Sequence, residues 1–179
     1  MTPLRFRCWM RLGDDRRGSV LIEFAITLPV MLLLFLGGYQ LCDAITCKRK
    51  VMIAARAVAD MTSQYTLITP SQVDTILGAS TQILAPYPVS AAKIRVSQIT
   101  VDGSGAPAIS WSRGYNNTAY VAGSAFNLPT TMRTANTSYI FAEITYTYQP
   151  VTVLLFGPLA YNQSLYMLPR GSSSVVLKP

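Results

Sequence analysis

The longest hydrophobic stretch of the chain lies near its N-terminus, from Val20 to Cys42. As an α-helix it would span about 34 Å, enough to cross a bilayer. Pro29 interrupts it, but membrane helices tolerate proline. A signal peptide would have a shorter apolar region followed by a cleavage site with small residues, and the sequence "DAITCKRK" that comes next offers no such site. The pattern therefore predicts a single-pass membrane anchor.

Apolar residues continue beyond this stretch at helical spacing. They alternate three and four positions apart, as in a heptad seam: Ala44, Cys47, Val51, Ala54, Val58, Met61 and Tyr65. No proline or glycine interrupts residues 39–69. We expect one helix from about Ser19 to Gln64, about 70 Å long. The seam is predicted to pack either on this chain's own distal domain or on neighbouring subunits, because it defines the shape of a partner but not its identity.

The pattern changes in the second half of the chain. A short helix is predicted from "TPSQVDTILGASTQIL", with Thr69 as its cap, Pro70 in its first turn, and its end before Pro86. The turn signal "DGSG" follows a β-branched run, so strands are predicted at 93–101 and 108–112. Residues 113–136 are rich in Gly, Asn, Thr and Ser and are expected to form a long loop.

The clearest strand is "SYIFAEITYTY", residues 138–148. Its alternation places five residues on one face: Ile140, Ala142, Ile144, Tyr146 and Tyr148. Residues 151–159 are expected to form a short helix or an apolar turn over the sheet, and residues 162–169 and 173–177 the last strands.

These elements define an α+β protein, in which a long N-terminal membrane-spanning helix extends into a small antiparallel β-sheet domain. We expect three segments. They are a basic cytoplasmic leader at 1–18, a long N-terminal helix at 19–65 with its transmembrane segment at about 20–42, and a small periplasmic or extracellular α+β domain at 66–179.

The charge pattern bears on orientation. The net charge is +7, and the leader contributes Arg5, Arg7, Arg11, Arg16 and Arg17. Positive residues before a span favour a cytoplasmic N-terminus, although three more, at 48–50, follow the span. The other basic residues are scattered, with no basic stripe that includes aromatic residues, so nucleic acid is not expected as a partner.

The side-chain inventory argues against an enzyme. The chain has no histidine, which excludes a Ser-His-Asp triad, a Cys-His pair and an imidazole metal site. Beyond residue 65 the only acids are Asp74, Asp102 and Glu143, and nothing pairs them. No catalytic residue, metal or cofactor is predicted. Cys42 and Cys47 lie about 140° apart around a helix and cannot bridge each other there.

The stretch "RRGSVLIEF", residues 16–24, resembles the processing site of type IV pilin-like proteins, and "EFAITLP" is similar to the TadE-like minor pilins of tight-adherence (Tad, or Flp-type) pili. The resemblance implies that a prepilin peptidase cuts after Gly18 and that Ser19 is the first mature residue. Glu23 is then the fifth and Phe24 follows it. Implied partners are this peptidase, other pilin and Tad assembly subunits, and the lipid bilayer. The implied location is the inner membrane, with the C-terminal domain periplasmic, and the pilus after assembly.

A charge inside an apolar helix is costly, so Glu23 needs an explanation. Cleavage after Gly18 would create an amine at Ser19, one helical turn away. The family implies that the amine of an incoming subunit pairs with Glu23 of a neighbour, where an unpaired charge would cost several kcal/mol. The alternative is a carboxylate near the cytoplasmic interface, where its cost is small.

The expected function is therefore a minor pilin that sits in, or primes, a Tad pilus. The alternative is an anchored periplasmic binding or assembly protein that is never polymerised and has no reason to lose its leader. A third interpretation is a pseudopilin of a type II secretion system.

Overall fold

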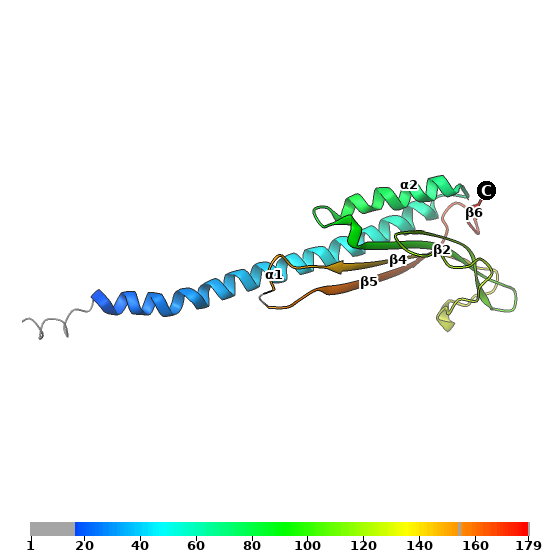
Figure 1. Ribbon diagram of the computed structural model, residues 1–179. Helices are drawn as coiled ribbons and strands as arrows, with labels where there is room; N and C mark the ends of the chain where they lie inside the picture. Colours follow the sequence, from blue (N-terminus) through cyan, green and yellow to red (C-terminus); the bar gives the residue numbers. More distant parts are fainter. Residues whose placement is uncertain (1–16, 154, 179) are drawn as a thin grey trace, which may run out of the picture.

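The computed structural model describes residues 17–153 and 155–178 of the chain. It is an α+β structure, as predicted: helix α1 (Arg17–Ser63) runs from an isolated N-terminal half into a domain made of helix α2 (Pro70–Thr81) and a four-stranded antiparallel sheet (Figure 1). Most of the predicted leader lies outside the described residues.

Helix α1 has 47 residues and continues through Pro29 without a break. Its N-terminal half projects away from the rest of the molecule, and its C-terminal half lies against the sheet (Figure 1). Along this half, a series of buried positions repeats every three or four residues: Gly37, Gln40, Ala44, Cys47, Val51, Ala54, Val58 and Thr62. The buried Ala55, Ala59 and Ser63 lie beside this series. The chain's own distal domain therefore covers the seam, which was one of the two predicted partners.

The predicted seam is wrong at its far end. Met61 is 40% exposed, and Thr62 takes the buried position instead. A straight helix has 3.6 residues per turn, so its buried stripe drifts away from a strict heptad repeat. Tyr65 lies beyond the end of α1 at Ser63 and is exposed.

The sheet has the strand order β3-β2-β4-β5. Its strands are β2 (Ala92–Val101), β3 (Pro107–Tyr115), β4 (Ser138–Tyr148) and β5 (Leu159–Met167), and every pair is antiparallel. Strand β4 has the predicted bounds. Strand β3 continues into the predicted long loop as far as Tyr115, so it was predicted too short. Strand β5 begins three residues before the predicted strand and ends two residues before its predicted end, so it was predicted too far along the chain.

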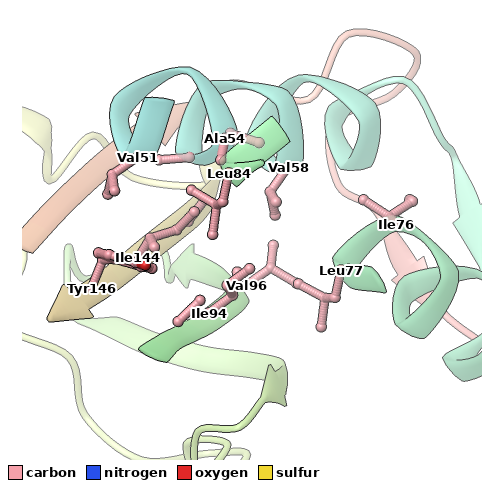
Figure 2. Close-up of a cluster of buried hydrophobic side chains, with 14 of the residues drawn as sticks. Val51, Ala54, Val58, Ile76, Leu77, Leu84, Ile94, Val96, Ile144 and Tyr146 are labelled. Atoms are coloured by element: carbon pink, nitrogen blue, oxygen red, sulfur yellow. The ribbon is translucent and has the colours of Figure 1, made fainter. Parts of the chain in front are cut away.

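The two faces of the sheet bury separate cores. On the helix side, Val51 and Val58 of α1 meet Leu77 of α2, Ile94 of β2 and Ile144 of β4 (Figure 2). The five β4 residues predicted to share a face all lie in this core. On the other side, the segment between β3 and β4 places Leu128 over a second cluster: Ile99, Val101, Ile109, Tyr139 and Phe141.

Because of a β-bulge, strand β3 contributes side chains to both cores. Gln98 pairs with Trp111 and Ile99 pairs with Ile109, so Ser110 is the extra residue. The extra residue shifts the alternation by one position. Trp111 consequently joins the helix-side core and Ile109 the opposite one.

Helix α2 starts as predicted. The Thr69 hydroxyl accepts a hydrogen bond from the Gln72 amide at 3.3 Å, and the Gln72 side chain accepts one from the Thr69 amide at 2.9 Å, which completes a capping box. A short 3₁₀ turn, η1 (Gln82–Leu84), follows α2.

Two C-terminal predictions are corrected. The described part of 151–158 forms no helix and lies against α1 rather than over the sheet, because the Gln40 side chain satisfies its backbone groups. Only Val176–Leu177 of the segment 173–177 forms a strand, β6, which pairs in parallel with β1 (Leu67–Ile68) outside the main sheet. There the amide of Val175 donates to the side chain of Gln98 rather than to a strand.

Candidate functional site: the exposed half of the long helix and its junction with the sheet

The predicted processing site lies in the first turn of α1. Gly18 and Ser19 are its second and third residues. Glycine is a poor helix former, so Gly18 weakens the helix locally. No described atom lies within 4 Å of the place where a Cβ at Gly18 would stand. Among residues 17–153 and 155–178, nothing outside the helix itself stands over the backbone at Gly18.

Glu23 and Phe24 lie one turn further along α1, and both side chains are exposed. Ser19 and Glu23 are neighbours at i and i+4, as the helical spacing predicted. No cation among the described residues forms an ion pair with Glu23. The Thr27 hydroxyl donates to the backbone carbonyls of Glu23, at 2.9 Å, and Phe24, at 3.3 Å, so it does not engage the carboxylate.

An apolar surface surrounds these residues on all sides of the helix. From Val20 to Leu36 every large hydrophobic side chain is between 40% and 72% exposed, and only 6% of the most apolar part of α1 is buried inside the molecule. A core helix of a soluble domain would be largely buried. This single N-terminal helix is long and apolar enough to cross a membrane, and it fits a membrane anchor.

Gln40 joins α1 to the connection between β4 and β5. Its side chain is only 2% exposed. Its Nε2 donates to the carbonyl of Phe156 at 2.8 Å, and its Oε1 accepts from the amide of Leu155 at 3.0 Å. One turn before it, a Cβ on Gly37 would come within 2.9 Å of Leu155 Cδ1, so the missing side chain permits this close contact. Gly38 has no described atom within 4 Å of an added Cβ.

Asp43 accepts hydrogen bonds from two tyrosines, at the point where the apolar stretch ends. The Tyr87 hydroxyl donates to Oδ1 at 2.7 Å, and the Tyr148 hydroxyl donates to Oδ2 at 2.7 Å. A third tyrosine, Tyr161, donates to the carbonyl of Ala44 at 3.0 Å. Together these bonds hold the distal domain against α1 at the end of its apolar stretch.

The titration behaviour follows from this packing. Burial, and then the hydrogen bond to Asp43, raise the pKa values of Tyr87 and Tyr148 above their usual value. Burial, and then the charge of Asp43, raise the pKa of Cys47 to about 11. Its thiol therefore stays protonated and weakly nucleophilic at neutral pH. Cys42 is exposed, and the two cysteines do not bridge each other, as the helical spacing predicted.

The acids beyond residue 65 all have local partners. Glu143 forms an ion pair with Arg95, whose guanidinium lies over the ring of Tyr120. Asp74 of α2 pairs with Arg113 of β3. Asp102 accepts from the amides of Ser104 and Ala106 in the β2–β3 turn. These carboxylates stabilise the domain and do not gather in one cleft.

Sequence reasoning missed Gln40 and Asp43. Asp43 is the first charged residue after Glu23 and directly follows the apolar stretch, which was the available signal. Its partners lie 44 and 105 residues away along the chain. No local pattern could therefore connect them.

The comparison with protein families identifies one match. A family model described as "TadE-like protein" matches residues 18–60, from the predicted cleavage site through most of α1. This match confirms the resemblance to the TadE-like family over this part of the chain. Neither the curated proteins nor the solved structures gave a match to the chain. The distal domain, residues 66–179, lies outside the matched region.

Proposed function

We propose that this protein is a minor pilin or assembly subunit of a Tad-type pilus. The observation that carries the proposal is the division of α1 into two halves. Its C-terminal half is built into the distal domain, whereas its N-terminal half is apolar, exposed on every side, and carries Glu23. The match to the TadE-like family over residues 18–60 supports the same function.

In this proposal the exposed half of α1 has two successive environments. It first anchors the chain in the inner membrane, with the N-terminus in the cytoplasm and the distal domain in the periplasm. A prepilin peptidase then cuts after Gly18, and the freed helix packs among the helices of neighbouring subunits. Glu23 pairs there with a Ser19 amine, because an unpaired carboxylate in such a bundle would cost several kcal/mol.

The first test concerns processing. Mature protein should begin at Ser19, and Gly18→Arg should remain uncut. Because no described atom lies near the Cβ position at Gly18, the distal fold should be unchanged by this substitution. Mass spectrometry of the N-terminus measures the cut. An intact N-terminus on wild-type protein taken from pili would contradict the proposal and favour an unpolymerised membrane anchor.

The second test separates cleavage from assembly. Glu23→Ala should be cut normally and remain in the membrane, since it removes a charge from an apolar helix. It should, however, give fewer pili or be missing from sheared filaments. Thr27→Ala, one turn away, is the control that removes a polar but uncharged side chain, and it should assemble normally. Normal piliation by Glu23→Ala would show that Glu23 is only a tolerated interfacial charge.

Orientation has its own test. A reporter that is active only in the periplasm, fused after Lys178, should be active. Activity of a cytoplasmic reporter alone at that position would reverse the topology and remove the basis for the pilin assignment.

A further inference from the structure

The connection between β4 and β5 exposes a cluster of apolar side chains beside the membrane-spanning part of α1. Val151 is 85% exposed, Val153 75% and Leu155 60%. The sequence from Pro150 to Leu159 contains no charged residue. Scattered apolar residues on a surface need no explanation, but three in five positions on one loop indicate a contact site.

The position of this loop along α1 identifies what it contacts. Leu155 packs against Gly37, and Gln40 binds the backbone at Leu155 and Phe156. Gly37 and Gln40 both belong to the apolar stretch that ends at Cys42. Gly37 lies about 7.5 Å below that end at 1.5 Å per residue. Groups that bind a membrane from its interface reach a depth of about 5–10 Å.

The polar groups around the loop are arranged as this depth requires. An unsatisfied backbone N–H or carbonyl in hydrocarbon costs several kcal/mol. The buried Gln40 amide satisfies one of each, at Leu155 and Phe156. Tyr39, which is 60% exposed, lies at the same level of α1, and tyrosine is favoured at membrane interfaces. The charged residues 48–50 begin about two turns beyond Gln40, where lipid headgroups would lie.

We propose that Val151, Val153 and Leu155 insert into the leaflet on the distal-domain side of the membrane that α1 spans. The loop is a second, interfacial membrane contact, and its partner is the acyl chains and headgroups of that leaflet. It holds the distal domain at a fixed height above the bilayer before assembly. The proposal rests on the membrane span of α1, but not on cleavage after Gly18 or on filament formation.

The test places a spin label on the loop in the full-length chain. Val153→Cys is compared with Val121→Cys, because both valines are 75% exposed and Val121 lies on the segment that covers the other face of the sheet. Cys8 and Cys42 are replaced by serine, and buried Cys47 remains. Each protein is placed in phosphatidylethanolamine–phosphatidylglycerol vesicles at a low ratio of protein to lipid. Accessibility to oxygen, which enters lipid, is measured against accessibility to a water-soluble nickel complex.

The ratio of oxygen to nickel accessibility should be severalfold higher at Val153 than at Val121, and Val151→Cys should behave like Val153→Cys. Leu33→Cys, in the middle of the predicted span, should give the highest ratio. A ratio at Val153 equal to that at Val121, with Leu33 in lipid, would overturn the loop contact alone. Water exposure at Leu33 would overturn the span and the loop contact together. Protection of Val153 from both reagents would assign the surface to a protein neighbour instead.

Discussion

The bonds from Tyr87 and Tyr148 to Asp43 allow a quantitative prediction for the junction between α1 and the distal domain. Asp43→Ala removes two hydrogen bonds of 2.7 Å to a charged acceptor. Such bonds contribute about 1.5–3 kcal/mol each. Two features reduce the total. Asp43 is only partly buried, and the Tyr87 hydroxyl retains the backbone carbonyl of residue 43 at 3.0 Å. We therefore expect a loss of about 2–4 kcal/mol in the free energy of unfolding.

The measurement is denaturant unfolding of the full-length chain in detergent micelles, followed by fluorescence of Trp111, which is 6% exposed in the helix-side core. Tyr146→Phe is a control for the loss of a tyrosine hydroxyl. That hydroxyl donates to the neutral carbonyl of Pro88 at 3.1 Å, so its removal should cost about 1 kcal/mol.

A mutant cycle tests whether the tyrosines are the reason for the loss. When Tyr87→Phe and Tyr148→Phe are already present, Asp43→Ala should cost much less than in the wild-type chain, because its two side-chain donors are gone. An equal cost in both backgrounds would refute this reasoning and would assign the effect to the helix itself.

Three further predictions concern neighbouring parts of the domain. Because the pKa values of Tyr87 and Tyr148 are raised above 10.0 in the folded chain, the unfolded chain loses these protons first. The contribution of these two tyrosines to stability should therefore be complete below pH 10 and fall above it. The dependence of stability on alkaline pH should be weaker in the Tyr87→Phe/Tyr148→Phe variant, and an unchanged dependence would contradict the assignment. Cys47 should react with a maleimide far more slowly than Cys42 in micelles, since Cys47 is buried and its pKa is about 11. The rates are measured by mass spectrometry on Cys8→Ser/Cys42→Ser and Cys8→Ser/Cys47→Ser chains, and equal rates would show that α1 separates from the sheet. Thr69→Ala should lower the free energy of unfolding by about 1 kcal/mol, because α2 loses its cap. The control is Thr75→Ala at an exposed position of the same helix, which should change the free energy of unfolding little.

Local patterns in the sequence were sufficient wherever an element depends mainly on its own residues. Unbroken helical spacing predicted α1 to within two residues at its start and one at its end, and strict alternation predicted β4 and the face that it buries. Helix α2 was recognised from its capping residues. The glycine, glutamate and apolar run at the start of α1 were enough to indicate the family that the comparison then matched.

The tertiary structure decided which surfaces meet. The seam of α1 was compatible with two partners, and only the folded domain showed that the sheet covers it, because periodicity defines a face but not what packs on it. Residues 173–177 read as a strand, yet Gln98 and Trp111 hold Val175 and leave only two residues to pair with β1. Gln40 and Asp43 bind groups more than 100 residues away, at Leu155, Phe156 and Tyr148. Contacts between such distant residues depend on the assembled core, so no stretch of sequence contains them.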